Sequence, residues 1–455
     1  MVNKNISKTI SGLLIMGMIT GCGASNATNE LKDKQITIST YWPSPYLEEV
    51  AKQFEKEHPD VDVKIEAFKE VGEPIKIKEG MEAPGEDKNP NLSLEDYITY
   101  LNTAFMGNSA PDLLMLGWVP DYKYAQSGYL VDLTSNIEST SQFTDEQYYM
   151  NVLKSCTYKD SIYAVPVAFN VTMLGVYEEA IEKAGLDETT FNEKYWTYKN
   201  RRELLDTVRN KEKQQLYLEG GDAINLFHNM YQLESNQFLQ VEEKVANFDD
   251  NKFITLLKEC KQAEENGLLY RGGIEDEAQN SLFTCELGGT TYCLYQPEYI
   301  GHVGDTNYAK PLMNEAGEIC LNISEKVAIT KDAKDQALCW EFIQEMLSEE
   351  MEKSPEVDGF PVNRNAATIK NTETAKKINK ELRFEGLKLQ KQPQEIANEL
   401  NVKIEEWVNM PYIKPSASDI DDVVYEETEE FFKGNKSAEE VAKNLQAKVY
   451  TMLNE

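Results

Sequence analysis

The sequence predicts an α/β protein built of two lobes, and three observations lead to this prediction. A chain of 455 residues is too long for one typical core and suits two domains of about 200 residues each. Residues 34–65 have the pattern of a strand, a helix and a second strand, the unit of a parallel sheet. Residues 158–177 have the pattern of a strand, a crossing segment and another strand, which indicates a chain that leaves one lobe and enters the next.

The first strand–helix–strand unit follows from local patterns. Apolar and polar residues alternate over residues 34–41 with the period of a β-strand. Ser44 and Pro45 have the residue types of an N-cap and a first helical position, and an apolar helical face continues until Pro59. Residues 61–65 alternate again. We therefore expect two parallel strands joined by a right-handed crossover.

Residues 72–91 interrupt this pattern with prolines, glycines and charges, and we predict a surface insertion that either decorates the fold or covers a ligand cleft. A helix is expected over residues 94–105, and a buried strand over residues 110–116 ends just before Trp118. Trp42 likewise follows the first strand. In open parallel sheets ligands lie beyond the carboxyl ends of the strands, so both indoles are candidates for binding.

Residues 158–177 are predicted to form two short strands around a hinge. Alternation begins at Ile162 and is expected to end at Pro166, because proline removes a donor from the ladder. A second strand is expected over residues 171–177, followed by a helix that ends at Gly185. The alternative is a single bent strand inside one domain.

Beyond the crossing segment the chain is predicted to be mainly helical. A strand at residues 327–329 precedes a helix whose N-cap is expected to be Thr330 and whose apolar face contains Trp340, which we assign to the core. The last helix opens with the capping-box pair Ser437 and Glu440. Other helices are expected at residues 201–211, 223–233 and 252–265, and around residues 420–431.

The N-terminal residues have the pattern of an exported lipoprotein. Two lysines precede an apolar run at residues 13–19 of signal-peptide length, and the four residues that end at Cys22 read ITGC, which resembles a bacterial lipobox. We therefore predict a signal peptide over residues 1–21, a lipid on Cys22 and a polar tether over residues 22–34. The alternative is an ordinary signal peptide with an accidental cysteine.

The composition argues against several classes of function. Lys and Arg number 46 against 78 Asp and Glu, a net charge of −32, so nucleic acid or an anionic membrane surface would be repelled over most of the protein. Six cysteines remain after Cys22 without a CxxC spacing, and the three histidines are far apart. Neither a metal site nor a histidine-based catalytic triad is therefore expected. Six cysteines in an exported chain permit disulfides, and their pairing stays open.

The order of these segments resembles the extracellular solute-binding proteins of bacterial ABC transporters, family 1, the large carbohydrate-binding, maltose-binding-protein-like family. The resemblance covers nearly the whole mature chain. Each segment alone is a weak motif, and the resemblance rests on their shared order behind the lipobox. The segments are ITISTYWPSPYLEEVAKQFEKEHPDVDV, NTAFMGNSAPDLLML, SGYLVDLT, YKDSIYAVPVAFN, GFPVNRNA and FFKGNKSAEEVAKNLQAKVYTMLNE.

The resemblance implies an α/β, two-lobe fold of the periplasmic-binding-protein type, with crossing hinge strands and a ligand cleft between the lobes. Lobe one would hold residues 35–165 and 319–347, and lobe two residues 166–318 and 348–455. The family is not enzymatic: ligand favours a closed state, which the membrane permease recognises. The implied partners are a carbohydrate and the transmembrane subunits of an ABC permease. We expect a monomer on the extracellular face of the bacterial cell membrane, without cofactor, metal or nucleic acid.

Five residues are candidates for ligand binding: Trp42, Trp118, Asn170, Tyr295 and Gln296. The two indoles would stack on a sugar from lobe one, and the other three residues would face them from lobe two. Relatives often have a tryptophan after a small-residue strand, where this chain has tyrosines in residues 288–299. Because tyrosines stand where the indole is expected, the resemblance does not fix the shape of the cleft.

Other functions stay open at this point. A lipid-anchored surface glycoside hydrolase would need two carboxylates about 5–5.5 Å or 6.5–9.5 Å apart across a cleft. With 78 acidic residues, the sequence does not exclude such a pair. A binding protein for a non-sugar solute such as a polyamine, metal or peptide, and an adhesin that binds polymer without a permease, fit the same pattern.

Overall fold

One large mixed sheet runs through the molecule, in the strand order β12-β9-β13-β8-β15-β5-β1-β2, with β14 and β16 also paired to β8 and β17 to β15. The computed structural model describes residues 34–72, 75–78, 81–83, 85–117, 119–186, 197–212, 215–272, 280–288, 310–378, 392–413 and 418–454. The strands of the large sheet are β1 (Lys34–Thr40), β2 (Val61–Ala67), β5 (Leu113–Met115), β8 (Val165–Val176), β9 (Tyr217–Gly220), β12 (Leu269–Tyr270), β13 (Ser281–Gly288), β14 (Lys310–Pro311), β15 (Ile319–Ile329), β16 (Phe360–Pro361) and β17 (Tyr412–Ile413).

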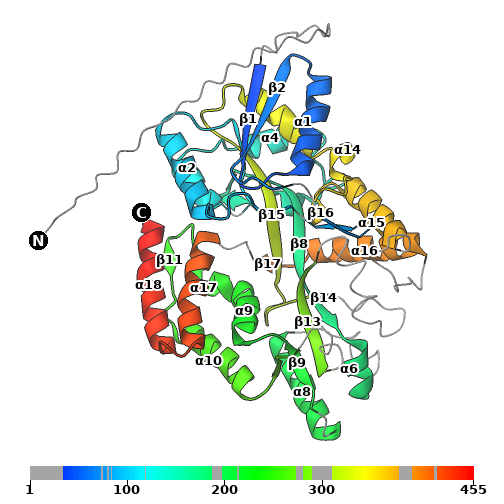
Figure 1. Cartoon of the computed structure of the whole chain (residues 1–455), viewed down its shortest axis with the longest axis vertical. Coiled ribbons are helices and arrows are strands. Elements are labelled where there is room, and N and C mark those ends of the chain that lie inside the picture. The colour runs from blue at the N-terminus through cyan, green and yellow to red at the C-terminus, as the bar shows by residue number, and fades with distance from the viewer. Residues whose placement is uncertain are drawn as a thin grey trace, which may run out of the picture.

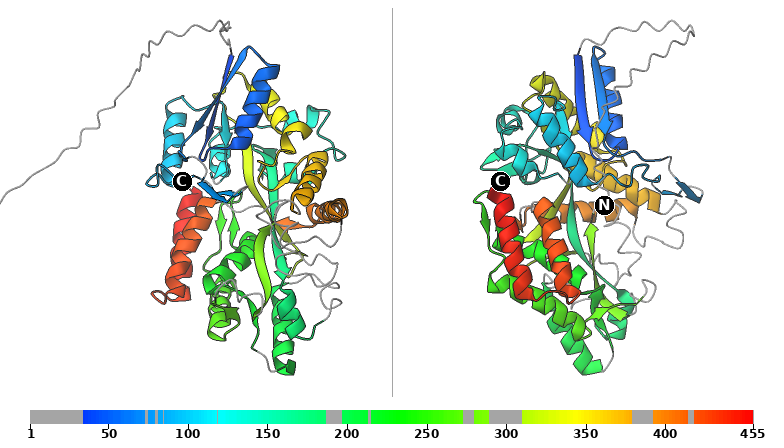
Figure 2. Two further views of the ribbon diagram at one scale, coloured as in Figure 1. Left: turned by 45° about the vertical axis from the view of Figure 1, so that its right-hand side comes forward. Right: turned by 60° about the vertical axis from the view of Figure 1, so that its left-hand side comes forward.

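Helices gather in two groups at the two ends of the long strands β8 and β15, as Figure 1 shows. Figure 2 shows the same two groups from two further sides. The helices are α1 (Pro45–Glu57), α2 (Leu94–Met106), α3 (Asp121–Gln126), α4 (Thr134–Ser139), α5 (Met150–Leu153), α6 (Glu178–Lys183), α8 (Tyr198–Glu212), α9 (Ala223–Phe238), α10 (Asn251–Glu265), α13 (Gln336–Met346), α14 (Glu349–Glu352), α15 (Arg364–Ile378), α16 (Pro393–Val408), α17 (Ser418–Phe432) and α18 (Ala438–Asn454).

The predicted strand–helix–strand unit is confirmed. β1 and β2 are parallel from the pair Lys34 and Val61 onward, and β5 pairs with the other edge of β1. Ser44 caps α1, because its side chain accepts a hydrogen bond from the Leu47 amide, and Pro45 occupies the first turn. Both strands therefore end at the edge of the sheet where their carboxyl ends meet.

The crossing segment is one continuous strand, so the prediction of two short strands separated at Pro166 is wrong. β8 runs unbroken from Val165 to Val176. The pairing of β8 with β15 is irregular beside the proline, where Lys326 lies opposite Pro166 and Glu325 opposite Ala168. Because the ladder is already distorted there, it tolerates the absence of the backbone N–H donor that proline lacks.

β15 is much longer than the strand predicted at residues 327–329, and it is the second strand that passes between the two groups of helices. It pairs with β5 at one end and with β17 at the other. Thr330 does not cap the next helix: its hydroxyl donates to the Pro111 carbonyl (2.7 Å), and Asp335 caps α13 instead. The threonine was misassigned because its partner lies far away in sequence.

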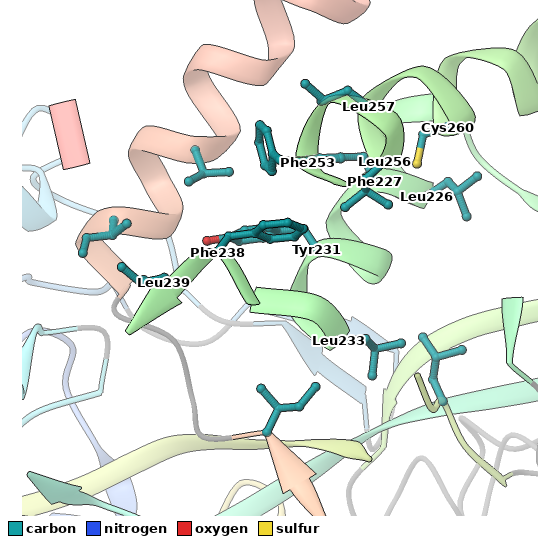
Figure 3. Close-up of a cluster of buried hydrophobic side chains, with 14 of the residues drawn as sticks. Leu226, Phe227, Tyr231, Leu233, Phe238, Leu239, Phe253, Leu256, Leu257 and Cys260 are labelled. Carbon is teal, nitrogen blue, oxygen red and sulfur yellow. The ribbon is translucent and has the colours of Figure 1, made fainter. Parts of the chain in front are cut away.

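The buried apolar residues form two clusters, and β8 contributes to both, with Val167 in one and Leu174 in the other. Trp340 is buried, as predicted. Figure 3 shows the aromatic centre of the second cluster, where Tyr231 and Phe238 of α9 lie beside Phe253 of α10. This cluster extends from α9, α10, α17 and α18 to α2 and α3, so helices from both groups share one core.

The insertion contains a hairpin, β3 (Ile75–Lys78) with β4 (Met81–Ala83). Two more small hairpins are β6 (Thr157–Tyr158) with β7 (Ser161–Ile162), and β10 (Leu239–Gln240) with β11 (Val245–Ala246).

The expected capping box is present, since the Ser437 amide donates to Glu440 (2.8 Å) and the Glu440 amide to Ser437 (3.2 Å). The residue boundaries of the two lobes stay a prediction. Within the described ranges, no helix combines the length and apolar character needed to cross a bilayer.

Candidate ligand site

The predicted binding residues divide into two that the structure describes and three that it does not. Trp42 and Asn170 are described, whereas Trp118, Tyr295 and Gln296 lie outside the described residues, as does Cys22. The assignment of all five residues to ligand binding therefore stays a prediction.

Trp42 lies just beyond the carboxyl end of β1 and is 40% exposed. Its indole packs edge-on against Tyr41, with ring centroids 5.4 Å apart, and the Lys69 ammonium lies 5.3 Å from the centre of the Trp42 ring. Lys69 is itself buried and bound by the Asp87 carboxylate and the Asn89 carbonyl, each at 2.7 Å. The indole is therefore oriented by a fixed cation while part of its surface faces solvent.

Asn170 is buried in β8 and lies beside Gly359. Gly359 has a positive φ of 106°, and a Cβ added there would lie 2.7 Å from the Phe169 carbonyl and 3.0 Å from the Asn170 amide nitrogen. Only glycine permits this backbone and this close approach. Asn170 thus belongs to a tightly packed junction of β8 with the segment before β16.

Three ionisable side chains and one hydroxyl form what we call the hinge cluster (Glu325, Glu352, Lys370 and Ser44), next to the irregular part of the β8–β15 ladder. Glu352 and Lys370 are buried, and Ser44 and Glu325 are partly buried. Ser44, two residues after Trp42, donates a hydrogen bond to Glu325, and the Lys370 ammonium is bound by the carbonyl of Gly359 (3.0 Å) and that of Val357. The hinge cluster thus connects Ser44, close to Trp42, and Gly359, beside Asn170, with the crossing strand β15.

Burial dominates the electrostatics of the hinge cluster. It raises the pKa of Glu325 to about 7, where nearby Asp358 adds to the effect, and it raises the pKa of Glu352 well above its usual range. Burial also lowers the pKa of Lys370 to about 8, although Asp358 and the two glutamates oppose this change. Each group is shifted toward its neutral form, as expected where charge is removed from water.

A cavity of about 370 Å³ lies between elements of the two predicted lobes. This volume is within the range of small-molecule sites. Lobe one supplies α3 and the segment 155–163, and lobe two supplies the end of α9, residues 239–243 and β17. The cavity wall includes the ion pair of Lys326 with Asp121 (2.7 Å) and, among others, the polar and aromatic residues Tyr158, Tyr163, Asn236, Gln240, Glu242 and Tyr412.

α3, which lines this cavity, also contacts the first turn of α17. The Lys123 ammonium pairs with Asp419 (2.9 Å), and the Tyr122 hydroxyl donates to the same carboxylate (3.3 Å). Burial, together with Asp419, raises the pKa of Tyr122 above its ordinary value. These bonds hold the two predicted lobes together in the conformation observed.

The cavity combines flat aromatic faces with amide and carboxylate groups, the combination that suits a polyhydroxylated ligand. Sequence reasoning did not find it, and neither Trp42 nor Asn170 lines it. Tyr158 and Tyr163 come from the segment YKDSIYAVPVAFN, whereas α9, residues 239–243 and β17 belong to parts of the chain without a motif, and only the fold brings them together. Among the described residues, no group of three or more His, Cys, Asp or Glu is arranged to hold a metal ion, and Cys156, Cys260, Cys285, Cys320 and Cys339 are free thiols.

Comparison with known proteins identifies structural neighbours only. No family model and no curated protein matches the chain. The sugar-binding protein MalE of Xanthomonas citri superposes with a TM-score of 0.61 at 13% identity, over 92% of this chain and 97% of that one. An ABC substrate-binding protein of Listeria monocytogenes, solved with cycloalternan, gives 0.56 at 16% identity, over 93% and 99%.

A third neighbour is described as a designed esterase, and it superposes with a TM-score of 0.57 at 14% identity, over 92% of this chain and 98% of that one. The comparison therefore does not by itself distinguish a binding protein from an enzyme. At these identities the likeness concerns the fold. The chain has the two-lobed α/β fold of periplasmic-binding-protein-like sugar-binding proteins.

Proposed function

We propose that this protein is the lipid-anchored extracellular solute-binding component of an ABC importer, and that it captures a sugar or oligosaccharide and delivers it to a membrane permease. The observation that supports this most directly is the arrangement of β8 and β15, two long strands that connect the predicted lobes beside a cavity lined from both. The structural neighbours that bind sugars, and the lipobox-like ITGC sequence, support the same proposal.

In the proposed mechanism, the ligand contacts both lobes and thereby favours the closed state over the open one. Bending is expected where the β8–β15 ladder is irregular, between Asn322 and Lys326, because fewer regular hydrogen bonds resist rotation there. The bonds from Tyr122 and Lys123 to Asp419 would break when the lobes open. A ligand shifts the equilibrium toward the closed state only to the extent that it binds the closed state more tightly than the open state.

A thermal-shift screen over mono- and oligosaccharides, followed by calorimetric titration, tests the proposal. A ligand at 100 times its dissociation constant should add about 2.7 kcal/mol to the free energy of unfolding. New reducing ends during incubation would instead identify a hydrolase. If no carbohydrate stabilises the protein while a polyamine or peptide does, the carbohydrate assignment is wrong.

Trp42→Ala tests whether the predicted indole belongs to the site. Loss of a stacking aromatic should weaken binding of the screened sugar by roughly 1–3 kcal/mol. Trp42→Phe keeps a flat ring and should retain much of the affinity. Tyr163→Ala probes the cavity in the same titration. If Trp42→Ala is folded and binds normally, Trp42 is not a ligand contact.

A further inference from the structure

Exposed aromatic side chains mark a second feature of the predicted first lobe. Five large apolar side chains are exposed in the described part of the chain: Trp42, Tyr100, Met106, Val402 and Tyr450. Trp42 and Tyr100, at 40% and 42% exposure, are the two ends of one continuous series of touching rings. Isolated exposed apolar residues are ordinary on protein surfaces, whereas a connected aromatic series is not.

We call this series the aromatic strip (Trp42, Tyr41, Phe68 and Tyr100). Ring centroids along it are 5.4 Å apart for Trp42 and Tyr41, 6.2 Å for Tyr41 and Phe68, and 5.8 Å for Phe68 and Tyr100. The two inner rings are partly exposed. Buried Tyr97 lies beneath them, 5.5 Å from Tyr41 and 5.2 Å from Phe68, and bonds to Ser39 at 3.0 Å.

The strip leads away from the crossing strands. Tyr41 and Trp42 follow the carboxyl end of β1, Phe68 follows that of β2, and Tyr100 lies on α2. β2 is the outermost strand on this side of the sheet, whereas β8 and β15 are central. A ligand bound at Trp42 therefore meets further aromatic surface as it extends toward the outer edge of the sheet.

Both exposed ends of the strip are held by polar partners. Lys69 lies at Trp42 and is bound by Asp87, which belongs to the predicted insertion. At the other end, Tyr100 bonds to Glu66, which also pairs with Lys64 (2.5 Å). These cations are matched by carboxylates, even though the chain as a whole is strongly acidic. A rigid aromatic surface with paired charges suits a neutral polar ligand better than an ion.

We infer that the aromatic strip is an extension subsite that binds the additional units of a neutral oligosaccharide whose first units lie near Trp42. This inference rests on the proposed carbohydrate function and narrows it to chains of several sugar units. Flat rings stack on the apolar faces of pyranoses, and the flanking charged groups reach their hydroxyls. The described base of the insertion, through Asp87 and Asn89, thereby acquires a supporting role at Trp42.

The test compares ligands of increasing length in calorimetric titration. Ladders of malto-, cello-, xylo- and fructo-oligosaccharides, from two to seven units, are titrated into the wild-type protein and into Tyr100→Ala. In the oligosaccharide series that binds, we expect Tyr100→Ala to weaken the affinity for the longer members about tenfold, equivalent to about 1.4 kcal/mol. The affinity for the disaccharide should be unchanged. Tyr100→Phe should behave like the wild type.

Matched controls separate this effect from a general loss of surface apolar area. Tyr450→Ala makes the same substitution at a tyrosine that is 59% exposed on α18, and Met106→Ala removes an exposed side chain from α2 itself. Both should bind every ladder member normally. If sugars bind but Tyr100→Ala weakens short and long members equally, or not at all, the extension subsite is refuted while the carbohydrate function stands. If no member of these series binds while a monosaccharide does, the extension subsite is refuted and the carbohydrate function stands. If no carbohydrate binds at all, both proposals fail.

Discussion

Replacing Glu427 by glutamine should destabilise the protein in a pH-dependent way. Glu427 is buried on α17, and its carboxylate accepts hydrogen bonds from Lys448 (3.0 Å) and Asn444 (3.2 Å) of α18, and from Lys436 of the connecting segment. One side chain therefore joins the two last helices. Glutamine preserves the shape and removes the charge.

The magnitude follows from the pKa of Glu427. Burial alone would raise it, but the hydrogen bonds from Lys436, Lys448 and Asn444 outweigh burial and lower the pKa from 4.5 to about 2. Such a change corresponds to about 3 kcal/mol of stability at neutral pH. Solvent reaches both lysines and weakens the ion pairs, so we expect roughly 1–3 kcal/mol.

The sign of the pH dependence is fixed by the lowered pKa. The stabilisation is fully present above about pH 5 and is lost as the pH falls through about 2. In urea unfolding followed by tryptophan fluorescence, Glu427→Gln should therefore have a much lower free energy of unfolding than the wild type at pH 7. At about pH 3 the difference in free energy of unfolding should shrink to less than half of its value at pH 7. Exposed Glu426, the neighbouring residue, provides the control Glu426→Gln. A difference between Glu427→Gln and the wild type that is independent of pH, or equal to that of the control, would refute this reasoning.

Three further predictions concern the core, the hinge and the N-terminus. Arg201 and Glu219 form a buried ion pair, so Arg201→Met should cost about 3–5 kcal/mol in chemical denaturation, and adding Glu219→Leu should restore much of it because no buried charge is left unpaired. A saturating ligand should reduce the radius of gyration in small-angle scattering by rotation about the crossing strands near residues 165–170, and an unchanged radius would contradict lobe closure. Cys22→Ser should release the protein from membranes, and a variant that stays membrane-bound would overturn the lipoprotein assignment.

The elements that could be predicted from the sequence depend on interactions within a few residues. Ser44 and Pro45 start α1, and Ser437 with Glu440 starts α18, because the atoms that bond are at most four positions apart. The alternation in residues 34–41 and 61–65 likewise identified two strands whose parallel pairing follows from the helix between them. Such patterns indicated the α/β class, whereas the periplasmic-binding type of fold was implied by the resemblance in the order of the segments.

The errors arose where a distant partner decides the local structure. Pro166 was expected to end a strand, but the irregular ladder with Glu325 and Lys326 accommodates it. Thr330 was expected to cap a helix, but it bonds to Pro111, more than two hundred positions earlier. In both cases a local rule was overridden by pairing across the sheet, which no window of neighbouring residues contains.

The sequence by itself determined the first strand–helix–strand unit, the caps of the helices that begin at Ser44 and Ser437, and the burial of Trp340, because local hydrogen bonding and hydrophobic periodicity specify these features. Only the tertiary structure decided which side chains meet at the interlobe cavity, in the hinge cluster and along the aromatic strip. Asp121 meets Lys326, and Tyr122 meets Asp419, across hundreds of residues. Long-range β pairing and packing bring these groups together, so chemistry that is dispersed in the chain becomes a site only after folding.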